Sequence, residues 1–286
     1  MTGPSRARGT TPFLRHASIL LLLSATSPAT GAPIACTATP GLAVDADGAP
    51  DSYRVDGKGL SATCDGVFAV VDGVAHTQKN DRPNWQALCA RHWDEARRTG
   101  NYAGVRIVGF LSDAAGRPVV QGAGDPLPGQ AFVTTTSLTI PGTPDSAQRH
   151  YVDAREIPYV VLSPAYARAS RLRLGDLVAV YRPRTGRLAY AVYADCCSNG
   201  EASVRLHQDL GSDPIVVAAD GAPRARRGLA DRIVLAPLPG AHPAPTLDAA
   251  AWRAAIAADG ETALHTLGGP DALRACAGSP LAGGVR

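Results

Sequence analysis

Two carboxylates, Asp195 and Glu201, lie six positions apart on either side of a tight polar turn. The apolar, β-prone residues 188–194 precede Asp195 and predict a strand that ends at this acid. Asn199 and Gly200 tolerate a left-handed backbone, so a turn here folds Glu201 back towards Asp195. Such a turn holds two carboxyl groups anywhere from near contact to about 10 Å apart, a range that includes both geometries of glycosidic-bond cleavage. The alternative interpretation is that Asp195 caps the turn and Glu201 is a solvated surface charge.

Alternation along this strand divides its side chains between two faces. One face carries Leu188, Tyr190, Val192 and Ala194, and the other carries Ala189, Ala191, Tyr193 and Asp195. The small residues beside the acid leave either open space, as in a groove, or room for a covering helix.

Residues 1–32 have the pattern of a secretory signal peptide. Three arginines precede the apolar run 19–23, and small residues follow it up to Ala32, so we expect cleavage near Gly31 or Ala32. A membrane anchor is the competing interpretation, but this run is far shorter than the roughly 20 residues that span a bilayer. We therefore expect a secreted, extracellular protein whose mature form has no membrane contact.

The charge balance changes when this segment is removed. It holds three of the 28 Lys and Arg residues and no acid, which leaves 25 basic residues against 25 acidic ones. The mature chain of this 286-residue protein is formally neutral, so no basic surface for nucleic acid is implied.

Six cysteines follow the signal segment, at positions 36, 64, 89, 196, 197 and 276. An even number in an exported chain predicts disulfides, with about 15 possible pairings. We expect Cys196 and Cys197 not to pair with each other, because a bridge between neighbours needs a strained peptide geometry. Each would instead reach elsewhere, for example to Cys89 or to the termini. No C-x-x-C or H-E-x-x-H motif is present, so we predict neither a metal site nor a cofactor.

The rest of the pattern predicts a mainly β protein. Strands are expected at 66–74, 104–111, 130–140, 177–181, 188–195, 215–219 and 233–236. Helices are expected at 83–98, with an apolar stripe from Trp85 to Ala96, and at 247–258, where Thr246 is the candidate cap, with a short turn at 271–276. We assign 33–240 to a catalytic β-barrel domain and 241–286 to a helical C-terminal extension packed on the same domain, in a monomer.

Five stretches resemble, in the same order, the secreted chitosanases of glycoside hydrolase family 75. They are LAVDADGAPDSYRVDGKGL from residue 42, VVQGAGDPLPGQAFVTTTSL at 119–138, YVDAREIPYVVL at 151–162, LGDLVAVY at 174–181 and AYAVYADCCSNGEASVRL at 189–206. The resemblance, to a bacterial-like secreted member, extends from about residue 40 to about residue 220.

This resemblance implies endo-hydrolysis of chitosan, the β-1,4-linked polymer of glucosamine, with inversion at the anomeric carbon. The two essential acids of the family are an Asp at a strand end and a Glu in a Gly-Glu-Ala-Ser motif, which fall on Asp195 and Glu201. Inversion needs one protonated and one ionised carboxyl group, and we assign Glu201 as general acid and Asp195 as general base. The chain departs from the family in its shorter segment between the acids and in the cysteines that follow Asp195.

A polycationic substrate implies further acids and aromatic faces along its binding site. The candidates are Asp45, Asp47, Asp153, Glu156, Tyr190 and Tyr193. Each of them is equally explained as a turn acid or a packed tyrosine.

The order Leu-Gly-Asp, strand, Thr-Gly turn and strand ending in Ala-Asp-Cys is also similar to the double-psi β-barrels of expansins. It implies a small closed barrel with peripheral helices. Two other functions therefore stay open, namely a non-hydrolytic, expansin-like polysaccharide-binding barrel and a hydrolase acting on another amino-sugar polymer such as peptidoglycan. A thiol oxidoreductase is disfavoured, because adjacent cysteines lack the C-x-x-C arrangement at a helix start.

Overall fold

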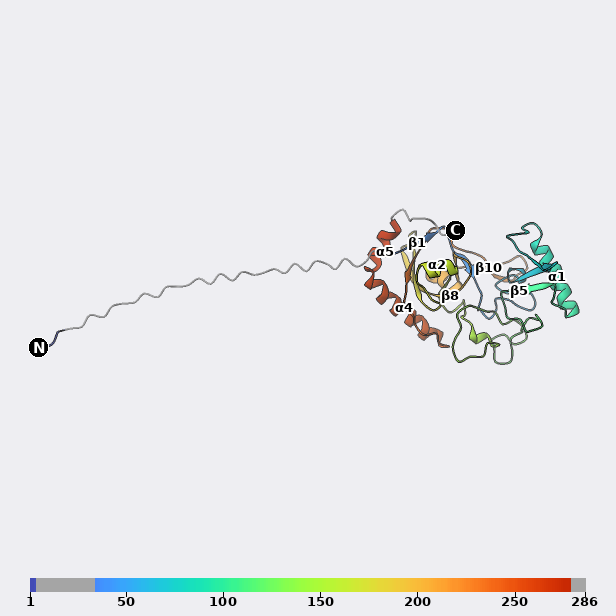
Figure 1. Ribbon diagram of the computed structural model, residues 1–286, viewed down its shortest axis with the longest axis horizontal. Helices are drawn as coiled ribbons and strands as arrows, with labels where there is room; N and C mark the ends of the chain where they lie inside the picture. Colours follow the sequence, from blue (N-terminus) through green and yellow to red (C-terminus); the bar gives the residue numbers. More distant parts are fainter. Residues whose placement is uncertain (4–33, 279–286) are drawn as a thin grey trace. The chain divides into compact units, whose positions relative to one another are not determined.

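The computed structural model describes residues 1–3 and 34–278 of the chain (Figure 1). The predicted cleavage position near Gly31 or Ala32 lies outside the described residues. The chain divides into one unit of residues 1–30 and a second unit of residues 31–286, and the description below concerns the second unit.

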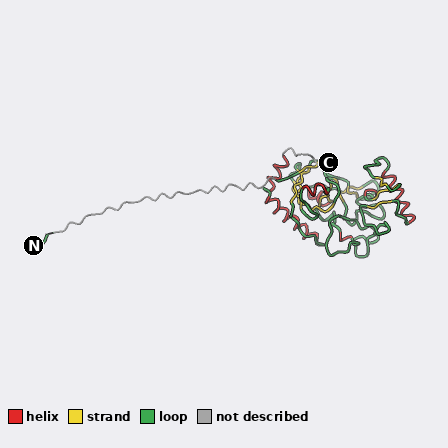
Figure 2. Tube along the Cα trace, viewed as in Figure 1, coloured by secondary structure: helices red, strands yellow, loops and turns green. Residues whose placement is uncertain are grey.

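Strands and a few helices form this unit, in agreement with the predicted mainly β class (Figure 2). The strands are β1 (Thr37–Thr39), β2 (Ala43–Asp45), β3 (Val67–Val71), β4 (Val74–His76), β5 (Val105–Ile107), β6 (Tyr159–Val161), β7 (Leu177–Arg182), β8 (Arg187–Asp195), β9 (Glu201–Ser203), β10 (Ile215–Val217), β11 (Pro223–Ala225) and β12 (Ile233–Leu238). The helices are α1 (Trp85–Thr99), α2 (Pro164–Ala169), α3 (Val204–Asp209), α4 (Ala249–Thr266) and α5 (Gly269–Gly278).

A mixed sheet of seven strands, in the order β1-β12-β7-β8-β6-β9-β2, carries the candidate acids. Its edge strands β1 and β2 are consecutive in the chain, with only residues 40–42 between them. Four extended steps from Thr39 to Ala43 span at most about 14 Å, whereas seven flat strands measure about 29 Å across. The sheet must therefore curl. Reciprocal backbone hydrogen bonds of 2.9 and 2.8 Å join Leu42, just before β2, to Leu229, in the segment before β12. The described ladders make a curled half-barrel, and closure into a barrel is not shown.

Helices cover both faces of this sheet. Trp252 and Ile256 of α4 belong to one buried cluster with Val192 and Ala194 of β8, and α4 lies beside the strands in Figure 1. Leu206 of α3 and residues of α2 pack on the other face, which includes Ala189, Ala191 and Tyr193 of β8. The predicted alternation along 188–194 is confirmed, and the small residues of the second face lie under a covering helix rather than along a groove.

A second, three-stranded sheet, β4-β3-β5, packs against α1. The predicted helix over 83–98 is confirmed with slightly shifted bounds, and Cys89, Trp93 and Ala96 of its apolar stripe are buried. Trp93 packs edge-on against the stacked rings of Phe110 and Phe132, with ring centroids 5.9 Å from each. The tryptophan is therefore a core residue of this small sheet.

The cysteine pairing corrects one expectation. Cys196 and Cys197 are bonded to each other, with Cα atoms 3.3 Å apart and a cis peptide bond between them. The other bonds are Cys36–Cys276, which ties β1 to α5, and Cys64–Cys89, which ties α1 to the turn before β3. The predicted link from the polar turn to Cys89 or to the termini is wrong.

Two further expectations need correction. Residues 130–140 form isolated bridges instead of a strand, because the amide of Thr134 donates to the side chain of Gln148 at 2.9 Å rather than to a neighbouring strand. Helix α4 begins after Asp248, whose carboxylate accepts from the amide of Ala251 at 3.0 Å, so Asp248 and not Thr246 is the cap. Within residues 34–278, we find no helix with the length and apolar character needed to cross a membrane.

Candidate functional site

Asp195 and Glu201 lie on the two sides of a single residue, Val161 of β6. Asp195 ends β8, which runs parallel to β6, and Glu201 begins β9, which runs antiparallel to it. Both acids are in register with Val161. Since neighbouring strands lie about 4.8 Å apart, the two backbones are about 10 Å apart across β6.

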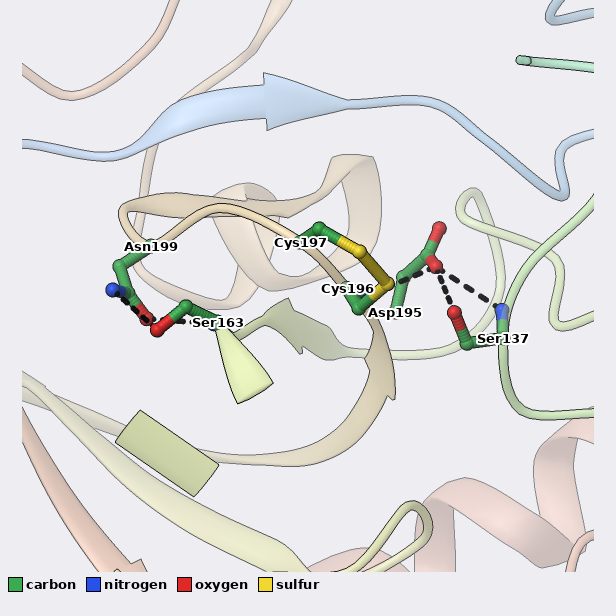
Figure 3. The surroundings of a disulfide bond; sticks show 6 residues. All are labelled: Ser137, Ser163, Asp195, Cys196, Cys197 and Asn199. Carbon is green, nitrogen blue, oxygen red and sulfur yellow. Dashed lines mark hydrogen bonds between the residues drawn. A yellow bond between two sulfur atoms is a disulfide. The ribbon is translucent and has the colours of Figure 1, made fainter. Parts of the chain in front are cut away.

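Hydrogen bonds with Ser163, which lies outside the turn, fix the turn between the two acids. Asn199 accepts a hydrogen bond from the backbone N–H of Ser163 at 2.8 Å and donates one to its hydroxyl at 3.0 Å (Figure 3). Ser163 also caps α2, so the turn is fixed to the start of that helix. Gly200 has φ of 89°, the left-handed conformation predicted for it, and a Cβ there would lie 3.2 Å from the hydroxyl oxygen of Thr39.

One oxygen of Asp195 accepts three hydrogen bonds. The donors are the backbone N–H of Ser137 at 3.1 Å, the hydroxyl of Ser137 at 2.6 Å and the backbone N–H of Cys196 at 2.8 Å (Figure 3). Burial raises the pKa of Asp195, and these donors oppose the rise because they stabilise the ionised form. Among the described residues, no group donates to its second oxygen, which is free to contact a ligand.

Glu201 is half-buried, and no described residue forms a hydrogen bond or an ion pair with its carboxylate. Its backbone pairs with Ala43 of β2 on one side and with Val161 on the other. The carboxylate of Glu201 is thus without a partner among the described residues, while its backbone is held by pairing with the strands on both sides.

Asp45 and Asp47, at the end of β2, complete a cluster of four acids. An oxygen of Asp45 accepts from the backbone N–H of Asp47 at 2.8 Å. The pKa of Asp45 is raised to about 7, first by burial and then by the charges of Asp195 and Glu201. The pKa of Asp47 is also well above its ordinary value, first because of burial and then because of the charges of Asp45 and Asp195.

The cluster has no basic counter-charge in the part of the chain that the structure describes. The recorded ion pairs of Arg and His residues all involve other acids, such as Asp51 with Arg155 and Asp231 with Arg182. Four unpaired carboxyl groups so close together create a strongly negative local potential unless some are protonated. The site is therefore suited to a cationic ligand.

The other predicted substrate-binding residues lie elsewhere. Tyr190 packs against Gly260 of α4, where an added Cβ would overlap its ring. Tyr193 is buried on the opposite face of β8. Asp153 and Glu156 line a separate pocket near the start of α4. The structure thus brings Asp45 and Asp47 to the two acids of the turn and leaves Tyr190, Asp153 and Glu156 apart from them. Tyr193 lies near Asp195, since burial and then the charge of Asp195 raise the pKa of Tyr193.

Ser137 is the residue of the site that sequence reasoning missed. It is 58 positions from Asp195 and lies in the Thr-rich stretch that was expected to form a strand. No local pattern distinguishes it from the neighbouring threonines.

An open hollow of about 870 Å³ lies beside Gly200, the residue that precedes Glu201. It is lined by residues 39–44, 199–200 and 225–230. In residues 34–278, no cluster of His, Cys, Asp and Glu is placed to hold a metal ion.

Comparison with known proteins adds no family to these observations. No family model matches the chain, and no curated protein is significantly similar to it.

Proposed function

We propose that this protein is a secreted endo-chitosanase, which hydrolyses the β-1,4 bonds of chitosan with inversion. The observation that carries the proposal is the cluster of four acids, Asp45, Asp47, Asp195 and Glu201, without a basic partner among the described residues. Chitosan carries one ammonium group on each deacetylated sugar, so it supplies the positive charge that the cluster lacks. The stretches that resemble family 75 chitosanases contain all four acids.

Glu201 acts as the general acid and Asp195 as the general base. Glu201 gives its proton to the glycosidic oxygen as the bond from that oxygen to the anomeric carbon breaks. A water molecule attacks the same carbon from the opposite face and loses a proton to Asp195, which yields a new reducing end of inverted configuration. Proton exchange with solvent then restores both groups.

The geometry supports this assignment of roles. The three donors at one oxygen of Asp195 favour its ionised form, as a base requires, and its other oxygen is available to a water molecule. Glu201 has a free side chain, as a group that reaches a leaving oxygen requires. Inverting enzymes hold their carboxyl groups about 6.5–9.5 Å apart, which two acids on strands separated by one intervening strand can adopt.

The curled half-barrel fits a double-psi-like barrel as the finer architecture, with Val161 in the strand between the acids. The three disulfides fit an oxidising, extracellular environment. The predicted signal segment agrees with export.

The test is viscosity loss and product sizing on highly deacetylated chitosan. Wild type should thin the solution rapidly and release oligomers, whereas Glu201→Gln and Asp195→Asn should each lose at least about 1,000-fold in rate, since removing either carboxyl group removes a proton-transfer step. Glu261→Gln, on the exposed surface of α4, is the matched control and should remain active. Full activity in either site variant would rule out the assigned pair.

The alternatives give different outcomes in the same assay. Binding to chitosan without thinning would indicate a non-hydrolytic, expansin-like polysaccharide-binding barrel. Release of fragments from peptidoglycan but not from chitosan would indicate a hydrolase of another amino-sugar polymer.

A further inference from the structure

The disulfide between Cys196 and Cys197 differs from the other two in what it can do for stability. A disulfide stabilises mainly by restricting the unfolded chain, and the restriction grows with the number of residues in the closed loop. The other two bonds join residues 240 and 25 positions apart, whereas Cys196 and Cys197 are neighbours in the chain. Their bond therefore contributes little through loop closure, and its place in the molecule points to another role.

This disulfide lies beside the general base proposed above. The backbone N–H of Cys196 donates to one oxygen of Asp195 at 2.8 Å, and Figure 3 shows the two sulfur atoms next to that carboxylate. The other oxygen of Asp195 is the one assigned to the attacking water. A sugar whose anomeric carbon is attacked by this water must lie close to Asp195, and therefore close to the disulfide.

The disulfide is accessible and fixed in place. Cys197 is exposed and Cys196 is half-buried. Hydrogen bonds hold the chain on both sides of the pair, from Cys196 to Asp195 and between Asn199 and Ser163. Disulfide sulfur is uncharged and polarisable, so it gains dispersion energy when carbon atoms pack against it. The pair thus presents a preorganised apolar surface at a site that otherwise consists of carboxylates.

A sugar ring needs such a surface, because binding sites for small ring compounds combine apolar walls with a few polar groups. The tyrosines nearest the four acids do not provide it. The pKa values of Tyr53, Tyr159 and Tyr193 are raised by burial and then by the charges of those acids, which places the three rings nearby. All three are buried, however, so their faces are covered by protein. The disulfide, in contrast, is an accessible apolar group next to Asp195.

We propose that the Cys196–Cys197 disulfide is part of the substrate-binding site, and that the sugar ring attacked by the water on Asp195 packs one face against the two sulfur atoms. The carboxylates bind the ammonium and hydroxyl groups of the polymer, and the disulfide binds its carbon skeleton. This contact presupposes the hydrolysis of chitosan proposed above and adds a binding group to that same site. It also gives a role to the two cysteines by which this chain departs from family 75.

Calorimetric titration with a glucosamine hexamer tests the contact, in the full chain carrying Glu201→Gln so that the ligand is not cleaved. Adding Cys196→Ser with Cys197→Ser removes the sulfur pair and should weaken binding about tenfold, because the ring loses its apolar surface. Adding Cys196→Ala with Cys197→Met instead supplies an apolar, polarisable side chain without the bond, and should restore the affinity to within about threefold. Equal affinity in the serine variant, or no recovery in the methionine variant, would overturn the proposal.

The kinetics of hexamer hydrolysis separate binding by the disulfide from positioning of Asp195. A contact made equally with substrate and transition state affects KM alone, so Cys196→Ser with Cys197→Ser should raise KM about tenfold and keep kcat within about threefold of wild type. The acidic limb of the pH–rate profile should stay in place, since the N–H of Cys196 is still available to Asp195. A large fall in kcat at unchanged KM, or a shifted limb, would show instead that the bond positions this N–H, and would contradict the proposal.

Protection of the bond by ligand is a test that needs no cysteine variant. Dithiothreitol reduces a disulfide to two thiols and is itself oxidised to a cyclic disulfide, and alkylation with mass spectrometry measures the rate at each bond. In Glu201→Gln, saturating hexamer should slow the reduction of Cys196–Cys197 at least about fivefold, because the bound ring covers the sulfur atoms. Cys64–Cys89, which ties α1 to the turn before β3, is the internal control and should be reduced at an unchanged rate. Equal rates at Cys196–Cys197 with and without the hexamer would overturn the proposal.

Failure of this contact and failure of the proposed function give different results. If the wild type cleaves no chitosan and Glu201→Gln binds no hexamer, both are overturned. If the wild type cleaves chitosan and the serine variant has the same KM, the hydrolase stands and the disulfide contact is rejected. The midpoint of thermal unfolding of the serine variant should lie within about 3 °C of wild type, since the bond closes no loop, so that weaker binding is not a result of unfolding.

Discussion

Ser137 donates two hydrogen bonds to the same oxygen of Asp195, one from its backbone N–H at 3.1 Å and one from its hydroxyl at 2.6 Å. We expect Ser137→Ala to raise the pKa of Asp195, because a donor to the ionised form is lost. A charge-assisted hydrogen bond stabilises by about 1.5–3 kcal/mol, so the acidic limb of the pH–rate profile should move up by about one to two units. Ser137→Thr keeps the hydroxyl and should restore the wild-type profile. An unmoved acidic limb in Ser137→Ala would show that this hydroxyl does not control Asp195.

Asp45 should make the protein less stable as the pH rises. Its pKa is about 7 in the folded protein and near 3.8 when unfolded. Between these values the folded protein holds a proton that the unfolded chain has released, so stability is lost as the pH rises through this window. Asp45→Asn should therefore increase the free energy of unfolding by about 1–3 kcal/mol at pH 7.5 and change it little at pH 4. Urea unfolding at the two pH values measures this difference, and equal effects at both would contradict it.

The bond between Cys36 and Cys276 joins residues 240 positions apart. Closing so long a loop restricts the unfolded chain strongly, and the double variant Cys36→Ser with Cys276→Ser should lose about 3–5 kcal/mol of stability. The Cys64–Cys89 bond spans 25 positions and provides the comparison, for which we expect a loss of about 3 kcal/mol. Thermal unfolding of the two double variants under non-reducing conditions shows which of them loses more stability. A larger loss for the shorter loop would show that strain or local packing, rather than loop length, dominates.

The start of α4 offers a paired test of capping. Asp248 accepts from the backbone N–H of Ala251, so Asp248→Ala should cost about 0.5–2 kcal/mol. Thr246→Ala removes only an acceptor for the backbone N–H of Asp248 at 3.3 Å and should cost less than about 0.5 kcal/mol. Chemical unfolding measures the loss of stability in each variant. A greater loss in Thr246→Ala than in Asp248→Ala would show that Thr246, the cap predicted from the sequence, caps the helix.

The strands around the acids could be predicted because their signals are local. Alternation along 188–194 correctly assigns each side chain to a face, and turn-forming residues place Gly200 in a left-handed conformation. The helix α1 follows from its apolar stripe in the same way. Asp45 and Asp47 were named as candidate substrate-binding acids, because a polycationic substrate implies further acids, and the structure brings them to Asp195 and Glu201.

The remaining features depend on contacts between distant residues. Ser137 is recognisable as a partner of Asp195 only once the chain is folded, since 58 positions separate them. The separation of Asp153 and Glu156 from the acid cluster likewise results from α4, which lies about 100 residues further along the chain and forms part of their pocket. Cys196 and Cys197 were assigned to other partners because a bridge between neighbours was expected to need a strained peptide geometry, whereas the structure bonds them to each other.

The position of Val161 between Asp195 and Glu201 makes the distance between the two acids independent of the shape of the turn that connects them. Because the backbone of each acid is hydrogen-bonded in register with β6, the spacing of the pair is a property of the sheet and not of residues 196–200. Insertions or deletions in that connection can change the shape of the entrance to the acids without changing the positions of the acids. The cysteine-containing connection, residues 196–200, is thus a rim that can vary in length while the sheet keeps the acid-to-acid distance.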